Sequence, residues 1–69
     1  MKTEIAKLLS FESTATPAIF TAIFGPDMGA HLWNKFTLKA GRSVTLFVRM
    51  LDTDNEAKFY SYLDQSWKN

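Results

Sequence analysis

The chain has no cysteine and only one histidine among its 69 residues. The lack of cysteine excludes disulfide bonds and the thiolate ligands of most structural zinc sites. His31 follows Asp27 by four residues, so the two side chains can share one helix face, but a zinc ion needs three or four ligands. We therefore predict that the protein has no metal site and no cofactor.

The sequence also lacks the short motifs of common catalytic and phosphate-binding sites. None of its serines has the G-x-S-x-G context of an esterase nucleophile, and its 3 glycines are too scattered for a phosphate-binding loop. A calcium loop that started at Asp52 would need glycine at its sixth position and glutamate at its twelfth, where the chain has Ala57 and Leu63. These absences predict that the protein is not an enzyme.

No apolar run approaches the roughly 20 residues that span a bilayer, and the formal net charge is only +1. With the lack of cysteine, this pattern predicts a soluble cytoplasmic protein with no membrane partner. The length fits a single domain over residues 1–69. Because so short a chain buries only about 60% of its unfolded surface, we expect a second copy to add stability through self-association. A chain this small also suits an accessory protein of a mobile genetic element.

The N-terminal part of the sequence predicts one helix and then a connector. Thr3 is a helix-start residue, and Ile5, Leu8 and Leu9 follow at the i, i+3, i+4 spacing that places side chains on one inward face. Between Phe11 and Thr16, three hydroxyl side chains favour turns and caps over a helix interior. That stretch is therefore predicted to be a connector.

Proline and glycine bound the second helix. Thr16 can cap a helix that begins at Pro17, where the missing amide hydrogen costs nothing. Gly25 and Pro26 then predict its end after Phe24. This segment is apolar on nearly all sides, which is typical of a helix that is buried. An edge or central strand is the alternative for this run, which the flanking proline and glycine only partly exclude.

A third helix is predicted beyond that boundary, with Asp27 as its cap. Met28, Leu32 and Phe36 repeat at i, i+4, i+8 and should face the core, and Gly41 marks the exit from the helix.

The last helix carries the S/T-x-x-E capping box, formed by Thr53 and Glu56. Phe59, Tyr60 and Leu63 follow as its apolar stripe.

The segment from Arg42 to Leu51 fits both a strand and a helix. Its apolar residues alternate, and β-branched Val44 and Val48 favour a strand. A strand needs a partner to pair with, however, and Ser43 can cap a helix here. We predict an all-α bundle of four to five short helices, with a strand over Arg42 to Leu51, and hence an α+β fold, as the open alternative.

Aromatic residues are abundant, with 6 phenylalanines, 2 tyrosines and 2 tryptophans. They exceed what one small core needs, and exposed apolar area is typical of binding surfaces. The sequence therefore predicts a non-enzymatic module that binds a protein partner and also self-associates. The candidate interface residues are Tyr60, Tyr62, Trp67, Phe20 and Phe24.

The charge pattern supports an alternative hypothesis, nucleic-acid binding. The stretch from Met28 to Met50 contains lysines and arginines but no acidic residue. The helices predicted between Pro17 and Phe36 could form a helix-turn-helix-like pair. The opposing interpretation is that the basic stretch packs beside the acidic C-terminal part of the same chain. The candidate nucleic-acid contacts are His31, Asn34, Lys35, Lys39 and Arg42.

Overall fold

The computed structural model describes residues 2–66, with side chains from residue 5 onward. This part of the chain is all α, as predicted, and contains five α-helices and one π-helical segment that continues the third helix. The elements are α1 (Lys2–Thr14), α2 (Pro17–Phe24), α3 (Pro26–Asn34), η1 (Lys35–Lys39), α4 (Val44–Arg49) and α5 (Thr53–Ser66).

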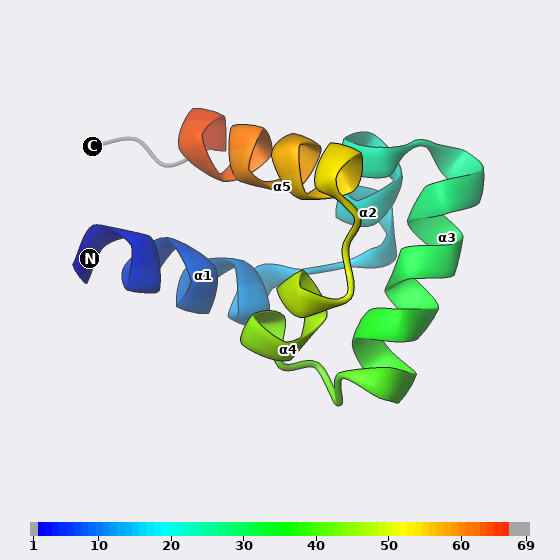
Figure 1. Ribbon diagram of the computed structural model, residues 1–69, viewed down its shortest axis with the longest axis horizontal. Helices are drawn as coiled ribbons and strands as arrows, with labels where there is room; N and C mark the ends of the chain where they lie inside the picture. The colour runs from blue at the N-terminus through cyan, green and yellow to red at the C-terminus, as the bar shows by residue number, and fades with distance from the viewer. Residues whose placement is uncertain (1, 67–69) are drawn as a thin grey trace.

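The helices enclose one core in a body of 31 × 22 × 21 Å. α1 and α5 lie side by side, with the start of α1 and the end of α5 at the same end of the molecule, and α3 stands across the opposite end (Figure 1). An ion pair between Lys7 and Asp64, at 2.8 Å, links α1 to α5. α2 packs against both α3 and α5.

α1 is longer than the sequence predicted, and the connector expected between Phe11 and Thr16 is wrong. The hydroxyls of Ser13 and Thr14 donate to the carbonyl oxygen of Ser10 at 3.1 and 2.9 Å, so they bond within the helix instead of ending it. The helix therefore continues as far as Thr14.

The inward face of α1 also differs from the prediction. Ile5 and Leu9 are each 58% exposed, and Leu8 is only partly buried against the core. Phe11 is buried instead, at i+3 from Leu8, and Ala15 is buried just after the end of the helix.

The start of α2 confirms the predicted cap, because Thr16 Oγ1 accepts from the Ile19 amide at 3.2 Å. Gly25 ends this helix with φ 95°, and its amide donates to the Thr21 carbonyl at 2.9 Å. The Gly25 carbonyl oxygen then accepts the first hydrogen bond of α3, from the Gly29 amide at 2.7 Å. A single residue therefore joins the two helices.

The predicted role of Asp27 as the α3 cap is wrong, because α3 already begins at Pro26 and Asp27 lies in the first turn.

Gly29 explains how closely α3 packs on α2. A Cβ atom at this position would lie 2.7 Å from the Phe20 carbonyl oxygen and 2.8 Å from Thr21 Cα. Only glycine fits this contact without moving a helix.

The end of α3 was not anticipated. The Ala40 amide donates to the Lys35 carbonyl at 2.9 Å, which is the i to i−5 bond of a π turn. Gly41 and Arg42 then adopt left-handed φ angles of 58° and 65°, and the Arg42 amide donates to the Phe36 carbonyl at 2.7 Å. The sequence indicated the exit at Gly41 but not the π turn before it.

The prediction of a helix over most of the segment from Arg42 to Leu51 is confirmed, so the strand alternative is wrong. Ser43 Oγ accepts from the Leu46 amide at 3.5 Å, as expected of a cap.

The structure corrects the predicted cap of α5. Asp52 Oδ1 accepts from the Asn55 amide at 2.9 Å, one residue before the predicted cap Thr53.

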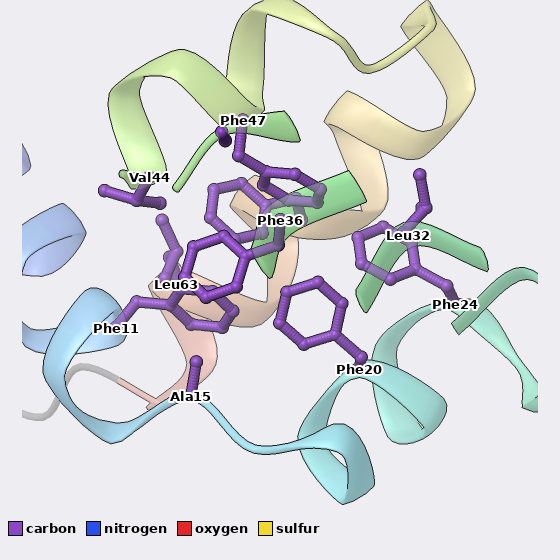
Figure 2. Close-up of a cluster of buried hydrophobic side chains, with 11 residues drawn as sticks. Phe11, Ala15, Phe20, Phe24, Leu32, Phe36, Val44, Phe47 and Leu63 are labelled. Carbon is purple, nitrogen blue, oxygen red and sulfur yellow. The ribbon is translucent and has the colours of Figure 1, made fainter. Parts of the chain in front are cut away.

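The core is built largely from phenylalanine. All 6 phenylalanines of the sequence are buried, together with smaller side chains such as Val44 and Leu63 (Figure 2). Phe11 and Phe59 meet edge to face with ring centroids 4.8 Å apart, and Phe20 and Phe36 lie 5.3 Å apart. Within residues 2–66, no helix combines the length and the hydropathy that crossing a membrane requires.

Candidate functional site

The aromatic residues proposed as a protein interface do not gather on one surface. Phe20 and Phe24 are core residues, 0% and 6% exposed. Tyr60 and Tyr62 are half-buried at the edge of the core. Trp67 lies outside the described residues. The prediction of Phe20 and Phe24 as interface residues is therefore wrong, and that of Tyr60 and Tyr62 stays a prediction.

Each tyrosine packs its ring edgewise on a core phenylalanine. The Tyr60 ring lies 5.5 Å from that of Phe59, and the Tyr62 ring lies 6.2 Å from that of Phe11. Tyr62 also borders a hollow of about 440 Å³ between α2 and α5, beside small side chains such as Ala22 and Ala57. These contacts give both tyrosines a role in closing the core.

The residues proposed as nucleic-acid contacts do gather. His31, Lys35 and Lys39 follow one another at i, i+4, i+8 along α3 and η1, and Asn34 lies beside them. Lys35 is half-buried, and the others are exposed. These three basic residues share one side of α3 and η1, which form a single continuous rod (Figure 1).

The lysines on this rod form no ion pair within the described residues. In the part of the chain that the structure describes, the one ion pair is that of Lys7 with Asp64, and neither Lys35 nor Lys39 has a carboxylate oxygen within 4.0 Å. Asp52, which belongs to the acidic C-terminal part, nevertheless lines the same hollow as Lys35. The basic stretch therefore lies beside part of the acidic segment without forming an ion pair with it.

Arg42 has a different position, above aromatic rings. Its guanidinium carbon lies 5.3 Å from the centroid of the Trp33 ring and 5.5 Å from that of Phe36. Such cation–π contacts contribute about 0.5 to 1 kcal/mol at exposed sites. They hold the left-handed turn after η1 against the core, which gives Arg42 a structural role whether or not it binds a ligand.

Exposed apolar side chains occur on the same rod and at the end of α4. Leu38 is 79% exposed, the largest value among the exposed large hydrophobic residues of the described chain. Met28 and Met50 are also exposed, at 40% and 37%. None of these three residues was a predicted site residue, and the prediction that Met28 faces the core is wrong. Leu38 lies between Lys35 and Lys39 in the sequence. This position was the one indication in the sequence that Leu38 could belong to a binding site.

The exposed apolar and basic residues line two adjoining hollows. One hollow, of about 240 Å³, includes Met28 of α3 and Met50 at the end of α4. The other, of about 170 Å³, includes Leu38. His31 and Lys35 line both hollows, so the two adjoin. We call this surface the α3–η1 face, and its lining residues are Met28, His31, Leu32, Asn34, Lys35, Leu38, Lys39, Met50, Leu51, Asp52 and Asn55.

The connection between α2 and α3 bears on the helix-turn-helix hypothesis. That motif joins its helices through a turn of about 3–4 residues. Here Gly25 alone joins α2 to α3. The pair therefore does not support docking on DNA in the manner of a helix-turn-helix protein.

Among residues 2–66, no group of three or more histidine, aspartate or glutamate side chains is placed to hold a metal ion. Comparison of the chain with protein-family models, with curated proteins and with solved structures finds no match.

Proposed function

We propose that this protein is a small non-enzymatic binding module that docks a protein partner on the α3–η1 face. One observation carries the proposal: Met28, Leu38 and Met50 line two hollows joined by His31 and Lys35. Apolar anchors with polar residues around them are typical of the energetic centre of a protein interface.

The exposure of Leu38 supports a protein partner. Complete burial of a leucine side chain stabilises a complex by about 1.5 to 3 kcal/mol relative to leaving it in water. Because Leu38 is 79% exposed, nearly all of this contribution is unused in the folded chain. The two methionines add side chains that adapt their shape to different apolar partners.

The proposal is tested by selecting peptides from a random library against the immobilised chain. The bound peptides are then measured against Leu38→Asp and against Leu9→Asp, a matched control on α1. Leu9 is also well exposed, at 58%, but lies outside the α3–η1 face. We expect Leu38→Asp to weaken binding by about tenfold or more, since it removes an anchor and adds a charge.

Circular dichroism checks that both variants keep the parental helix content. Equal binding by the Leu38→Asp variant and the parent would contradict the proposal. A loss confined to Leu9→Asp would move the binding surface to α1.

Nucleic-acid binding is the second candidate function, and the absence of ion pairs at Lys35 and Lys39 favours it. Replacing these lysines and Arg42 by alanine would then weaken duplex DNA binding at every sequence and flatten its salt dependence. Fluorescence anisotropy with a mixed-sequence duplex measures this. Binding that is insensitive to these substitutions would exclude the basic residues as the DNA surface.

Self-association forms part of the proposal and is tested separately by light scattering over a dilution series. A dimer that the Leu38→Asp substitution dissociates would identify a second copy of the chain as the occupant of the α3–η1 face.

A further inference from the structure

Building on the proposed function, we infer that the partner segment on the α3–η1 face is an acidic amphipathic helix. It carries two large apolar residues one helical turn apart. Two properties of the face lead to this partner: the separation of its hollows and the distribution of its charges.

The separation follows from the residues that line each hollow. On α3, the first hollow extends from Met28 to Lys35, whereas the second extends from His31 through η1 to Lys39. The second lining is thus displaced along the rod by about one turn, or about 5.4 Å. Residues at i and i+4 of a partner helix have nearly the same spacing and lie on one face. One such pair of leucine-sized side chains can therefore enter both hollows together.

The charges are unevenly distributed along the face. Lys35 and Lys39 surround the Leu38 hollow without a carboxylate partner. Asp52 lines the other hollow, but its Oδ1 is occupied by the Asn55 amide at 2.9 Å. The positive end of the face is therefore the η1 end. Acidic side chains of the partner should flank the apolar residue that covers Leu38, where they can meet both lysines.

The apolar residues distinguish this partner from nucleic acid. On a DNA backbone, the exposed Leu38 would lie against phosphates between the two lysines and would gain little from burial. Asp52 at the other end of the face would repel the same backbone. A helix with apolar anchors and acidic flanks satisfies both the hydrophobic and the cationic parts of the surface.

The experiment uses the full chain and three fluorescein-labelled peptides of identical length, each spanning about four helical turns. The first carries leucines at i and i+4 flanked by glutamates. The second has the same composition with the two leucines on opposite helix faces. The third replaces every glutamate by lysine. A mixed-sequence DNA duplex is the fourth probe, and anisotropy is measured at low and high salt.

We expect the first peptide to bind about tenfold more tightly than the second or the third. Alanine at Lys35 or Lys39 should weaken its binding by roughly two- to fivefold each, as for ion pairs at an interface rim. High salt should reduce the difference between the first and third peptides. Alanine at Lys58, which lies on α5 away from the face, is the matched control and should leave binding unchanged.

Each other outcome overturns the inference in a distinguishable way. Equal binding of the scrambled peptide rejects the one-turn spacing, and equal binding of the lysine peptide rejects the acidic partner. If Leu38→Asp still abolishes the binding of the scrambled peptide or of the lysine peptide, the proposed function stands and only the partner class is wrong. Failure of all three peptides rejects the inferred partner. DNA binding that is tighter than peptide binding and lost on removal of the lysines replaces the protein partner with nucleic acid.

Discussion

Replacement of Gly29 by alanine tests the closest contact in the fold, between α2 and α3. The added Cβ would lie 2.7 Å from the Phe20 carbonyl oxygen, and backbone atoms of Thr21 and Phe20 follow at 2.8 and 2.9 Å. All three neighbours belong to the backbone of α2, so no flexible side chain can move aside. One of the two helices must shift by several tenths of an ångström.

Two effects of opposite sign decide how much Gly29→Ala changes the free energy of unfolding. Alanine is favoured over glycine in a helix interior by about 0.8 to 1 kcal/mol. Overpacking a tight contact costs about 1 to 3 kcal/mol, and here the clash is with three backbone atoms of α2. We therefore expect net destabilisation of about 1 kcal/mol. For a domain of this size, that lowers Tm by about 4 to 8 °C.

The assay is urea and thermal unfolding followed by circular dichroism. Ala30→Gly, at the exposed neighbouring position of α3, measures the helix propensity term alone and should destabilise by about 1 kcal/mol. Gly29→Ala would then destabilise the fold despite its better propensity. An unchanged or raised Tm for Gly29→Ala would refute the close approach of α2 and α3.

The remaining predictions concern the N-terminal cap of α5 and the aromatic contacts of Arg42. Asp52→Ala should lower the free energy of unfolding by about 1 kcal/mol because the Asn55 amide loses its acceptor, whereas Asp52→Asn should restore most of it. Urea unfolding measures both, and equal stability of the alanine variant and the parent would contradict the role of Asp52 as cap. Arg42→Ala should cost about 0.5 to 1 kcal/mol through loss of the Trp33 and Phe36 contacts. Arg42→Gly loses the same contacts but relieves the left-handed φ of 65°, so it should be more stable than Arg42→Ala.

Local chemistry explains which helix boundaries could be predicted from the sequence. Thr16 and Ser43 each accept a bond from an amide three residues ahead, and a cap of this kind depends only on neighbouring residues. The α5 cap was misplaced by one residue because Asp52 and Thr53 are adjacent and both suit the position. Such one-residue choices are decided by the path of the incoming chain.

Burial was less predictable, because it depends on how helices pack. Spacing alone placed Ile5 and Leu9 inward, yet α1 turns the side of Phe11 to the core. Phe20 and Phe24 looked available for an interface, but this core takes every phenylalanine of the chain. The basic candidates on α3 and η1 came from charge pattern, and the structure gathers His31, Asn34, Lys35 and Lys39 on one surface.

The same packing explains why the α3–η1 face is the surface left for a partner. α2 covers one side of α3 through Gly29, and Leu32, Phe36 and Ala40 face the core at i, i+4, i+8. Leu38 does not belong to this core and is 79% exposed. Since so exposed a side chain contributes little to folding, Leu38→Asp should change stability by less than about 0.5 kcal/mol. Gly29→Ala, by contrast, should lower stability, because α2 or α3 must shift to relieve the contact. If Leu38→Asp removes binding but leaves the free energy of unfolding unchanged, Leu38 therefore acts in partner binding and not in folding.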